Sequence, residues 1–131
     1  MTERVSIELP GFSHANPVPV GARIGPFLAS GALTGRDPGT GEMPADLAQQ
    51  CTNVFGHARA LLAAAGGSWD DVLKMTFQLA DPGDREALNS EWLATFPDPA
   101  HRPARQVVAA RLGGGALVHG DLLAVLRDTD R

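Results

Sequence analysis

Apolar residues recur at steps of three and four between Leu47 and Ala65, a spacing typical of one apolar face of a helix. The residues of this face are Leu47, Cys51, Val54, Phe55, Ala58, Leu61, Leu62 and Ala65. Pro44 suits the first turn, Asp46 lies where the helix dipole favours an anion, and Gly66 with Gly67 supplies a left-handed stop. We therefore expect one long helix with a buried face.

Alternating apolar and polar residues predict strands on both sides of this helix. The expected elements are a strand at 5–9 ended by Pro10-Gly11, an extended Pro-rich loop at 14–21, a strand at about 24–31, a turn at 36–42, a strand at 73–79 and a second helix at about 84–96. Within the second helix, Leu88, Trp92 and Phe96 follow at four-residue steps and form its apolar face.

The last third of the chain predicts a β-hairpin with a glycine turn. Its strands are expected at 105–112 and 116–126, joined by Gly113 to Gly115. If Leu112 pairs with Ala116, odd-numbered residues share one face, so Arg105 lies on the same face as His119 and diagonal to Asp121. The even-numbered residues are apolar and are expected beneath the helices.

The order strand, strand, helix, strand, helix, strand, strand predicts a single α+β domain spanning residues 1–131. The two helices are expected to pack on one face of a mixed β-sheet. The other face carries Arg, His and Asp among apolar residues, and no further helix is expected to cover it. We therefore expect that face to be buried between subunits.

Composition excludes several classes of protein. The formal net charge is −4 and the basic residues are scattered, so nucleic acid is not expected as a partner. No apolar run approaches the roughly 20 residues of a membrane span, and the start MTERVSIELP lacks a secretory pattern, so a cytoplasmic protein without membrane contact is expected. One cysteine and four histidines without close spacing predict no disulfide, metal site or cofactor.

A series of motifs resembles the Rid family, also called YjgF, RidA or UK proteins, over nearly the whole chain. In chain order the motifs are RIGPFLASG, DPGTGE, LLAAAGGSWDDVLKMTFQLAD, ALNSEWLATF, PAR before a Val-rich strand, ARL, and the terminal LLAVL. The resemblance implies a chorismate-mutase-like fold, a homotrimer, and ligand sites in the clefts between subunits. It also implies an enamine/imine deaminase that releases ammonia and a keto acid.

The resemblance assigns roles to particular residues. Arg105, in PAR, matches the arginine that holds the substrate carboxylate, while Ser30, Gly31 and Asn89 match positions that border the ligand. The last strand carries His119 where deaminases of the family have Glu, and Asp121 follows at the next inward position.

Two further departures concern residues near the site. The chain has no Tyr, so NPVPVG stands where the family has a GPY motif, and Val107 replaces a frequent Cys.

Each candidate also has a plain structural interpretation. Arg105 either binds a ligand or forms an intersubunit ion pair, for example with Asp121. His119 is either a general base or a hydrogen-bonded interface residue. Asp121 either orients His119 and water or pairs with an arginine as a structural carboxylate. Cys51, on the apolar helix face, is expected in the core and not as a nucleophile.

These residues support two main functions. The first is hydrolytic deamination of 2-imino or 2-enamino carboxylic acids, with Arg105, His119 and Asp121 as catalytic residues and Ser30, Gly31 and Asn89 in the binding site. The second is a non-catalytic trimer that retains the pocket and binds a small organic acid. An endoribonuclease, an older label of the family, is disfavoured by the acidic composition and the lack of a basic track.

Overall fold

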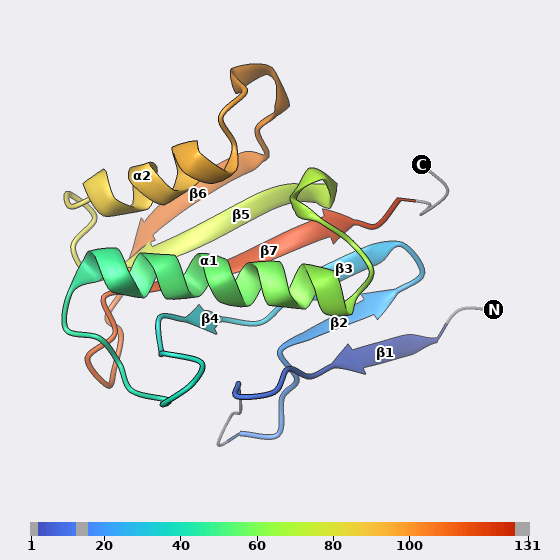
Figure 1. Ribbon diagram of the computed structural model, residues 1–131, viewed down its shortest axis with the longest axis horizontal. Coiled ribbons are helices and arrows are strands. Elements are labelled where there is room, and N and C mark those ends of the chain that lie inside the picture. The colour runs from blue at the N-terminus through green and yellow to red at the C-terminus, as the bar shows by residue number, and fades with distance from the viewer. Residues whose placement is uncertain (1–2, 13–15, 128–131) are drawn as a thin grey trace.

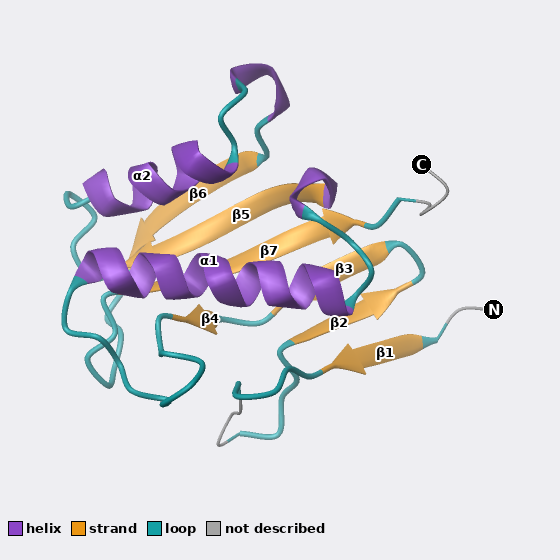
Figure 2. Ribbon diagram, in the orientation of Figure 1, coloured by secondary structure: helices purple, strands orange, loops and turns teal. Residues whose placement is uncertain are grey.

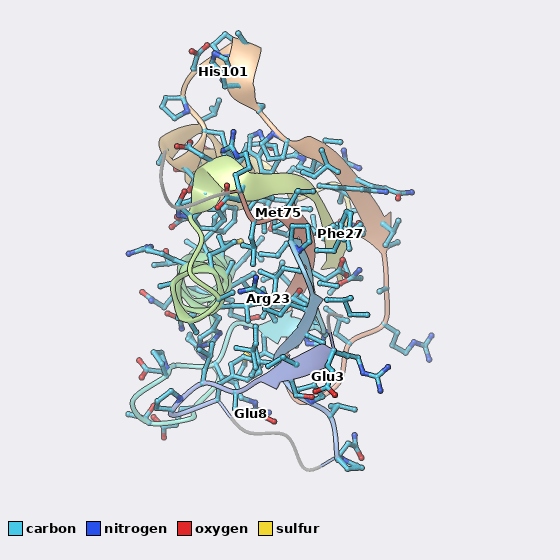
Figure 3. All side chains as sticks on the ribbon, turned by 90° about the vertical axis from the view of Figure 1, so that its right-hand side faces the viewer. Glu3, Glu8, Arg23, Phe27, Met75 and His101 are labelled. Carbon is cyan, nitrogen blue, oxygen red and sulfur yellow. The ribbon has the colours of Figure 1, made fainter. Side chains whose placement is uncertain are left out.

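A computed structural model describes residues 3–12 and 16–127 as one mixed β-sheet with two helices on one face (Figures 1 and 2). The helices are α1 (Leu47–Ala64) and α2 (Glu86–Thr95), and short 3-10 helices lie at Trp69–Asp71 and Pro99–His101. In Figure 3, α1 is seen end-on at one side of the sheet, and the opposite side, here called the open face, has no helical layer. The expected α+β class and helix arrangement are thereby confirmed.

The sheet has the strand order β1-β2-β3-β7-β5-β6, with β4 also pairing β7. Its strands are β1 (Arg4–Ile7), β2 (Gly21–Ile24), β3 (Phe27–Ser30), β4 (Leu33–Thr34), β5 (Val72–Leu79), β6 (Ala104–Ala109) and β7 (Val118–Val125). Only β5 and β6 run parallel, because α2 carries the chain back between them; every other pair is antiparallel. The sheet is therefore mixed, as expected.

The long helix has the expected apolar face but a different start. Asp46 is the N-cap, and its side chain accepts a hydrogen bond of 3.1 Å from the Gln49 backbone nitrogen. Pro44 consequently lies outside the first turn, where the sequence had placed it. Gly66, with φ of +82°, follows the helix and supplies the expected left-handed stop.

Cys51 lies in the core, as expected for a residue on the buried face of α1. Burial, with smaller contributions from Glu91 and Asp84, raises the pKa of its thiol to about 12. The thiol is therefore a packing group and not a nucleophile.

One expected strand is organised differently. The strand predicted at about 24–31 covers only the last residue of β2 together with β3, and these two strands form a hairpin because Gly25 adopts φ of +56° and Pro26 follows it in a tight turn. The two-residue strand β4 was not predicted.

The prediction of a C-terminal hairpin is wrong. β5 lies between β6 and β7, so the two strands expected to pair never touch. Gly114 and Gly115, with φ of +66° and +79°, belong to a longer loop that carries the chain across β5. The arrangement changes the faces: Arg105 pairs with buried Met75 on the helix face, whereas Asp121 pairs with Thr76 on the open face.

A buried glutamine attaches this glycine loop to α1. The Gln50 amide nitrogen donates to the carbonyls of Pro44 (2.7 Å) and Gly115 (3.1 Å), and its oxygen accepts from the Leu117 backbone nitrogen (2.7 Å). The Gln50 side chain is fully buried. These bonds set where the loop ends and β7 begins.

Neither helix in the described part of the chain is long and apolar enough to cross a membrane.

We expect Gln50→Leu to lower the free energy of unfolding by about 2 to 3 kcal/mol, because three hydrogen bonds of the loop are lost while a side chain of similar size remains. Chemical denaturation measures this difference. Gln49→Leu, at an exposed neighbouring position, is the control and should change stability by less than about 0.5 kcal/mol. Equal effects of the two variants would contradict the anchoring role of Gln50.

Candidate functional site

Arg105 lies at the edge of the sheet, on the helix face of β6. Its guanidinium carbon stands 5.1 Å from the centre of the Trp92 ring of α2, a cation–π contact. The side chain is half-buried, and burial followed by the nearby charge of Arg85 lowers the pKa of Arg105. The guanidinium is thus held on an aromatic surface and partly removed from water.

Arg105 has neither an ion pair nor a side-chain hydrogen bond within residues 3–12 and 16–127. The expected contact with Asp121 does not form within one chain, since the two side chains lie on opposite faces of the sheet. A partly desolvated cation without an acid is costly to the fold. The arrangement leaves its donors available to an anion from outside the chain.

Asn89 lies on the same side of α2 as Trp92. The two residues are three positions apart, so they are neighbours on the helix surface, and Asn89 is exposed while Trp92 is mostly buried. Arg105, Trp92 and Asn89 therefore form one group, here called the arginine half-site. Trp92 was predicted only as core; its spacing from Asn89 was the available signal for a second role.

His119 and Asp121 lie on β7 and point to the open face. Their partners on β5 are Gln78 opposite His119 and Thr76 opposite Asp121. The Gln78 amide nitrogen donates to the Asp121 carboxylate at 3.5 Å, a long contact. The alternation of Lys74, Thr76 and Gln78 predicted this polar face of β5 but gave Gln78 no role.

Burial lowers the pKa of His119 below its ordinary value of 6.5. The imidazole is therefore neutral at pH 7 and able to accept a proton. A neutral imidazole on the same strand face as a carboxylate two residues away is suited to general-base chemistry on a bound water.

Ser30 and Gly31 lie beside β7, between its pairings with β3 and β4. The Ser30 hydroxyl accepts from the Leu122 backbone nitrogen at 2.9 Å and donates to the Gly31 carbonyl at 2.8 Å. The Gly31 nitrogen donates to the Val20 carbonyl at 2.9 Å. The Ser30 hydroxyl thus stabilises the connection between β3 and β4. Gly31 is exposed and has no side chain, so it leaves the surface there uncovered.

His119, Asp121, Ser30 and Gly31 form a second group, here called the histidine half-site. The arginine half-site lies two strands away, on the other face of the sheet. The expectation that Arg105 shares a face with His119 and Asp121 is therefore wrong for a single chain. One copy alone does not assemble all the candidate residues around a small ligand.

The open face continues from the histidine half-site into an apolar patch. Four of its side chains are about half exposed or more: Ile24 (50%), Phe27 (64%), Leu73 (61%) and Leu123 (49%). They surround a hollow that is also lined by Ala22, Ala29 and Val125. Phe27 is labelled in Figure 3. An apolar patch of this kind on a sheet without a helical cover is typical of an interface between proteins.

No group of three or more His, Cys, Asp or Glu side chains suited to a metal ion occurs among residues 3–12 and 16–127.

Comparison with known proteins finds a match over most of the chain. The profile of the family described as Endoribonuclease L-PSP matches residues 18–125. A 2-iminobutanoate/2-iminopropanoate deaminase of Escherichia coli is 31% identical over 113 residues, which cover 85% of this chain and 88% of that protein. A RutC family protein of Pyrococcus horikoshii is 32% identical over 120 residues, covering 86% and 94%.

Solved structures show the same fold. RidA from the Antarctic bacterium Psychrobacter sp. matches with a TM-score of 0.86 and 27% identity, covering 93% of this chain and 99% of that one. TdcF of E. coli with bound serine matches with a TM-score of 0.85 and 26% identity, covering 94% and 99%.

We expect an NMR titration of the His119 ring to give a pKa below 6.5, because burial disfavours the imidazolium. The signal is assigned by its absence in His119→Gln. A ring that is still charged at pH 7 would contradict the assignment of a neutral base.

Proposed function

The chain belongs to the Rid family, whose profile is described as Endoribonuclease L-PSP, and on that premise we propose that it is a hydrolytic deaminase of 2-imino or 2-enamino carboxylic acids. The observation that carries this proposal is the partly buried Arg105, held on the Trp92 ring without an internal acid. A planar guanidinium binds a carboxylate through two parallel hydrogen bonds, which fixes both position and orientation.

The reaction needs one water and no cofactor. Water attacks the imine carbon while neutral His119 accepts one of its protons, and the carbon becomes tetrahedral. That proton then passes to the substrate nitrogen, which gives a carbinolamine. The proton of its new hydroxyl group passes to the same nitrogen as the C–N bond breaks, so that ammonia leaves and the keto acid forms. Asp121 orients His119 or the water, and Gln78 restrains Asp121. Such imines hydrolyse spontaneously, so positioning and one base supply enough catalysis.

The complete site is proposed to lie between copies of the chain. One copy supplies the arginine half-site and a neighbour supplies the histidine half-site, because the two groups lie on opposite faces of one sheet. We propose a homotrimer in which the apolar patch of the open face is buried. The proposed setting is the cytoplasm, where amino acid metabolism generates imines.

Among the similar proteins, one is named a 2-iminobutanoate/2-iminopropanoate deaminase and another structure holds bound serine, itself an amino acid with a carboxylate. Both support a small carboxylate ligand. The formal net charge of −4 favours such a ligand over RNA, despite the word endoribonuclease in the family description.

A second candidate is a trimer that binds a small organic acid without turnover. The observation that favours it is a difference in the groups that could transfer protons: His119 stands where the family has Glu, and the chain has no Tyr. Thermal stabilisation by a keto acid, without ammonia release from any imine, would favour this candidate.

We expect Arg105→Leu to lower kcat/KM for deamination by about 30-fold or more, because losing one partner of a desolvated charge pair costs about 2 to 5 kcal/mol. Ammonia release is measured with imines generated in situ by an amino-acid oxidase. Arg105→Lys keeps the charge but not the two parallel bonds, so its activity should be intermediate. Arg111→Leu, at an exposed loop position, is the control and should keep full activity. Unchanged activity of Arg105→Leu would refute the proposed role.

We expect light scattering to give three times the 13.7 kDa mass of one chain, and Leu123→Asp to give a smaller species. The substitution puts a carboxylate into the apolar patch, where it is buried on assembly. Ala63→Asp, on the exposed side of α1, should leave the assembly intact. A monomeric protein of unchanged activity would refute the shared site.

A further inference from the structure

A second arginine lies on the same side of α2 as the arginine half-site. Arg85 is the N-cap residue of α2, four positions before Asn89 and seven before Trp92, so the three share one side of the helix. Its Nε donates to the Pro82 carbonyl at 2.8 Å, which fixes the base of the guanidinium group. The Arg85 side chain is exposed, and its two terminal nitrogens make no hydrogen bond within the described ranges.

The charges of Arg85 and Arg105 act on each other. After burial, the Arg85 charge is the second cause that lowers the pKa of Arg105, so the two guanidinium groups share one electrostatic environment. Within residues 3–12 and 16–127, the carboxylates in ion pairs are Asp98 with His101 and Asp71 with Arg127. Within these ranges, therefore, neither Arg85 nor Arg105 forms an ion pair with a carboxylate.

The acidic residues of this region are placed elsewhere. Asp84, Glu86 and Glu91 line the groove between α1 and α2. The Glu91 carboxylate accepts a hydrogen bond of 2.5 Å from the Thr52 hydroxyl of α1. These three acids thus lie toward α1, two of them next to Arg85 in the sequence, whereas Arg85 of α2 and Arg105 of β6 form no ion pair within the described ranges.

We propose that Arg85 is a specificity-determining residue that binds a second carboxylate, so that the preferred substrates are 2-imino or 2-enamino dicarboxylic acids. This inference rests on the proposed function. Arg105 binds the carboxylate next to the imine carbon, and Arg85 binds the carboxylate at the far end of the substrate. Each guanidinium offers a planar set of donors that matches a carboxylate.

The second carboxylate leaves the chemistry unchanged. Water adds to the imine carbon, the C–N bond breaks, and a 2-oxo dicarboxylate and ammonia are formed. The class of reaction that supplies such a substrate is the oxidation of an acidic amino acid at its amino-bearing carbon, or the dehydration of an acidic amino acid that carries a hydroxyl on the next carbon. A monocarboxylate binds Arg105 alone and leaves the repulsion between the two arginines only half neutralised.

The test uses two substrates that differ only at the far end. An amino-acid oxidase generates the imines of glutamate and of norvaline, which have the same number of carbon atoms in the main chain. We expect kcat/KM to be at least tenfold higher for the glutamate imine. Arg85→Gln should lower kcat/KM for that imine about tenfold and change it less than twofold for the norvaline imine, while Arg85→Lys keeps part of the preference.

Arg59→Gln, at an exposed position of α1, is the matched control and should leave both substrates unaffected. Equal rates for the two imines in the native protein would overturn the proposal. An equal loss on both imines in Arg85→Gln would also overturn it, since that pattern belongs to a structural residue.

Direct binding separates this inference from the deaminase proposal. If neither imine is turned over, the proposed function fails, and calorimetric titration with 2-oxoglutarate and with 2-oxopentanoate still tests Arg85. Binding of 2-oxoglutarate at least tenfold tighter than 2-oxopentanoate, with the difference lost in Arg85→Gln, supports the second carboxylate site. Equal binding of the two acids, or no binding of either, overturns it.

Discussion

The position of β5 between β6 and β7 decides which side chains of this protein can meet. Parallel pairing with β6 puts Arg105 level with Met75 on the helix face, and antiparallel pairing with β7 puts Asp121 level with Thr76 on the open face. Neighbouring strands are about 4.8 Å apart, so the two functional groups are separated by roughly 10 Å within the sheet and also by its thickness. One chain therefore does not bring both groups to the same small ligand, and for this reason the proposed site is shared between copies.

The aromatic ring beneath Arg105 explains how a cation without an acid is tolerated at the sheet edge. Trp92 belongs to the aromatic cluster of the core: its ring centre lies 4.7 Å from that of Phe96 and 6.3 Å from that of Phe77. The ring is consequently fixed, and it offers the guanidinium a π-face worth about 0.5 to 2 kcal/mol. This cation–π stabilisation is smaller than that from a buried carboxylate. The ring therefore orients the guanidinium group and leaves it able to bind an anion. A strong internal ion pair would have closed the site.

Much of the fold followed from the periodicity of the sequence, and the errors have a common cause. Helices and strands with a clear period, such as α1 and β5, were predicted within a few residues, because the apolar pattern reports which face is buried. The hairpin at the C-terminus was wrong because a glycine run between two apolar segments has the same local signature in a tight turn and in a loop that crosses another strand. Only the long-range pairing of β5 distinguishes the two, and no local pattern encodes that pairing.

Prediction of the site was limited in the same way, because local sequence patterns do not show which distant residues meet. The resemblance identified Arg105, His119, Ser30, Gly31 and Asn89 as candidates, and the fold divides them into two groups whose members are near one another. The resemblance gave no role to Trp92, whose sequence context is that of an ordinary core residue. Its contact with Arg105 depends on the packing of α2 against β6, which the local sequence does not encode.

The proposed division of the site between copies links the chemistry to assembly. In the proposed trimer, groups of two copies surround the carboxylate bound at Arg105, so ligand binding and assembly stabilise each other. Burial has a different effect at the histidine half-site. Burial within one chain already lowers the pKa of His119, and burial of the open face in the proposed trimer is expected to lower this pKa further and keep the ring neutral. The proposed trimer therefore holds a charged anion receptor and an uncharged base side by side, two groups that a single sheet separates. Under this proposal, assembly is part of the catalytic apparatus, because it unites the two groups.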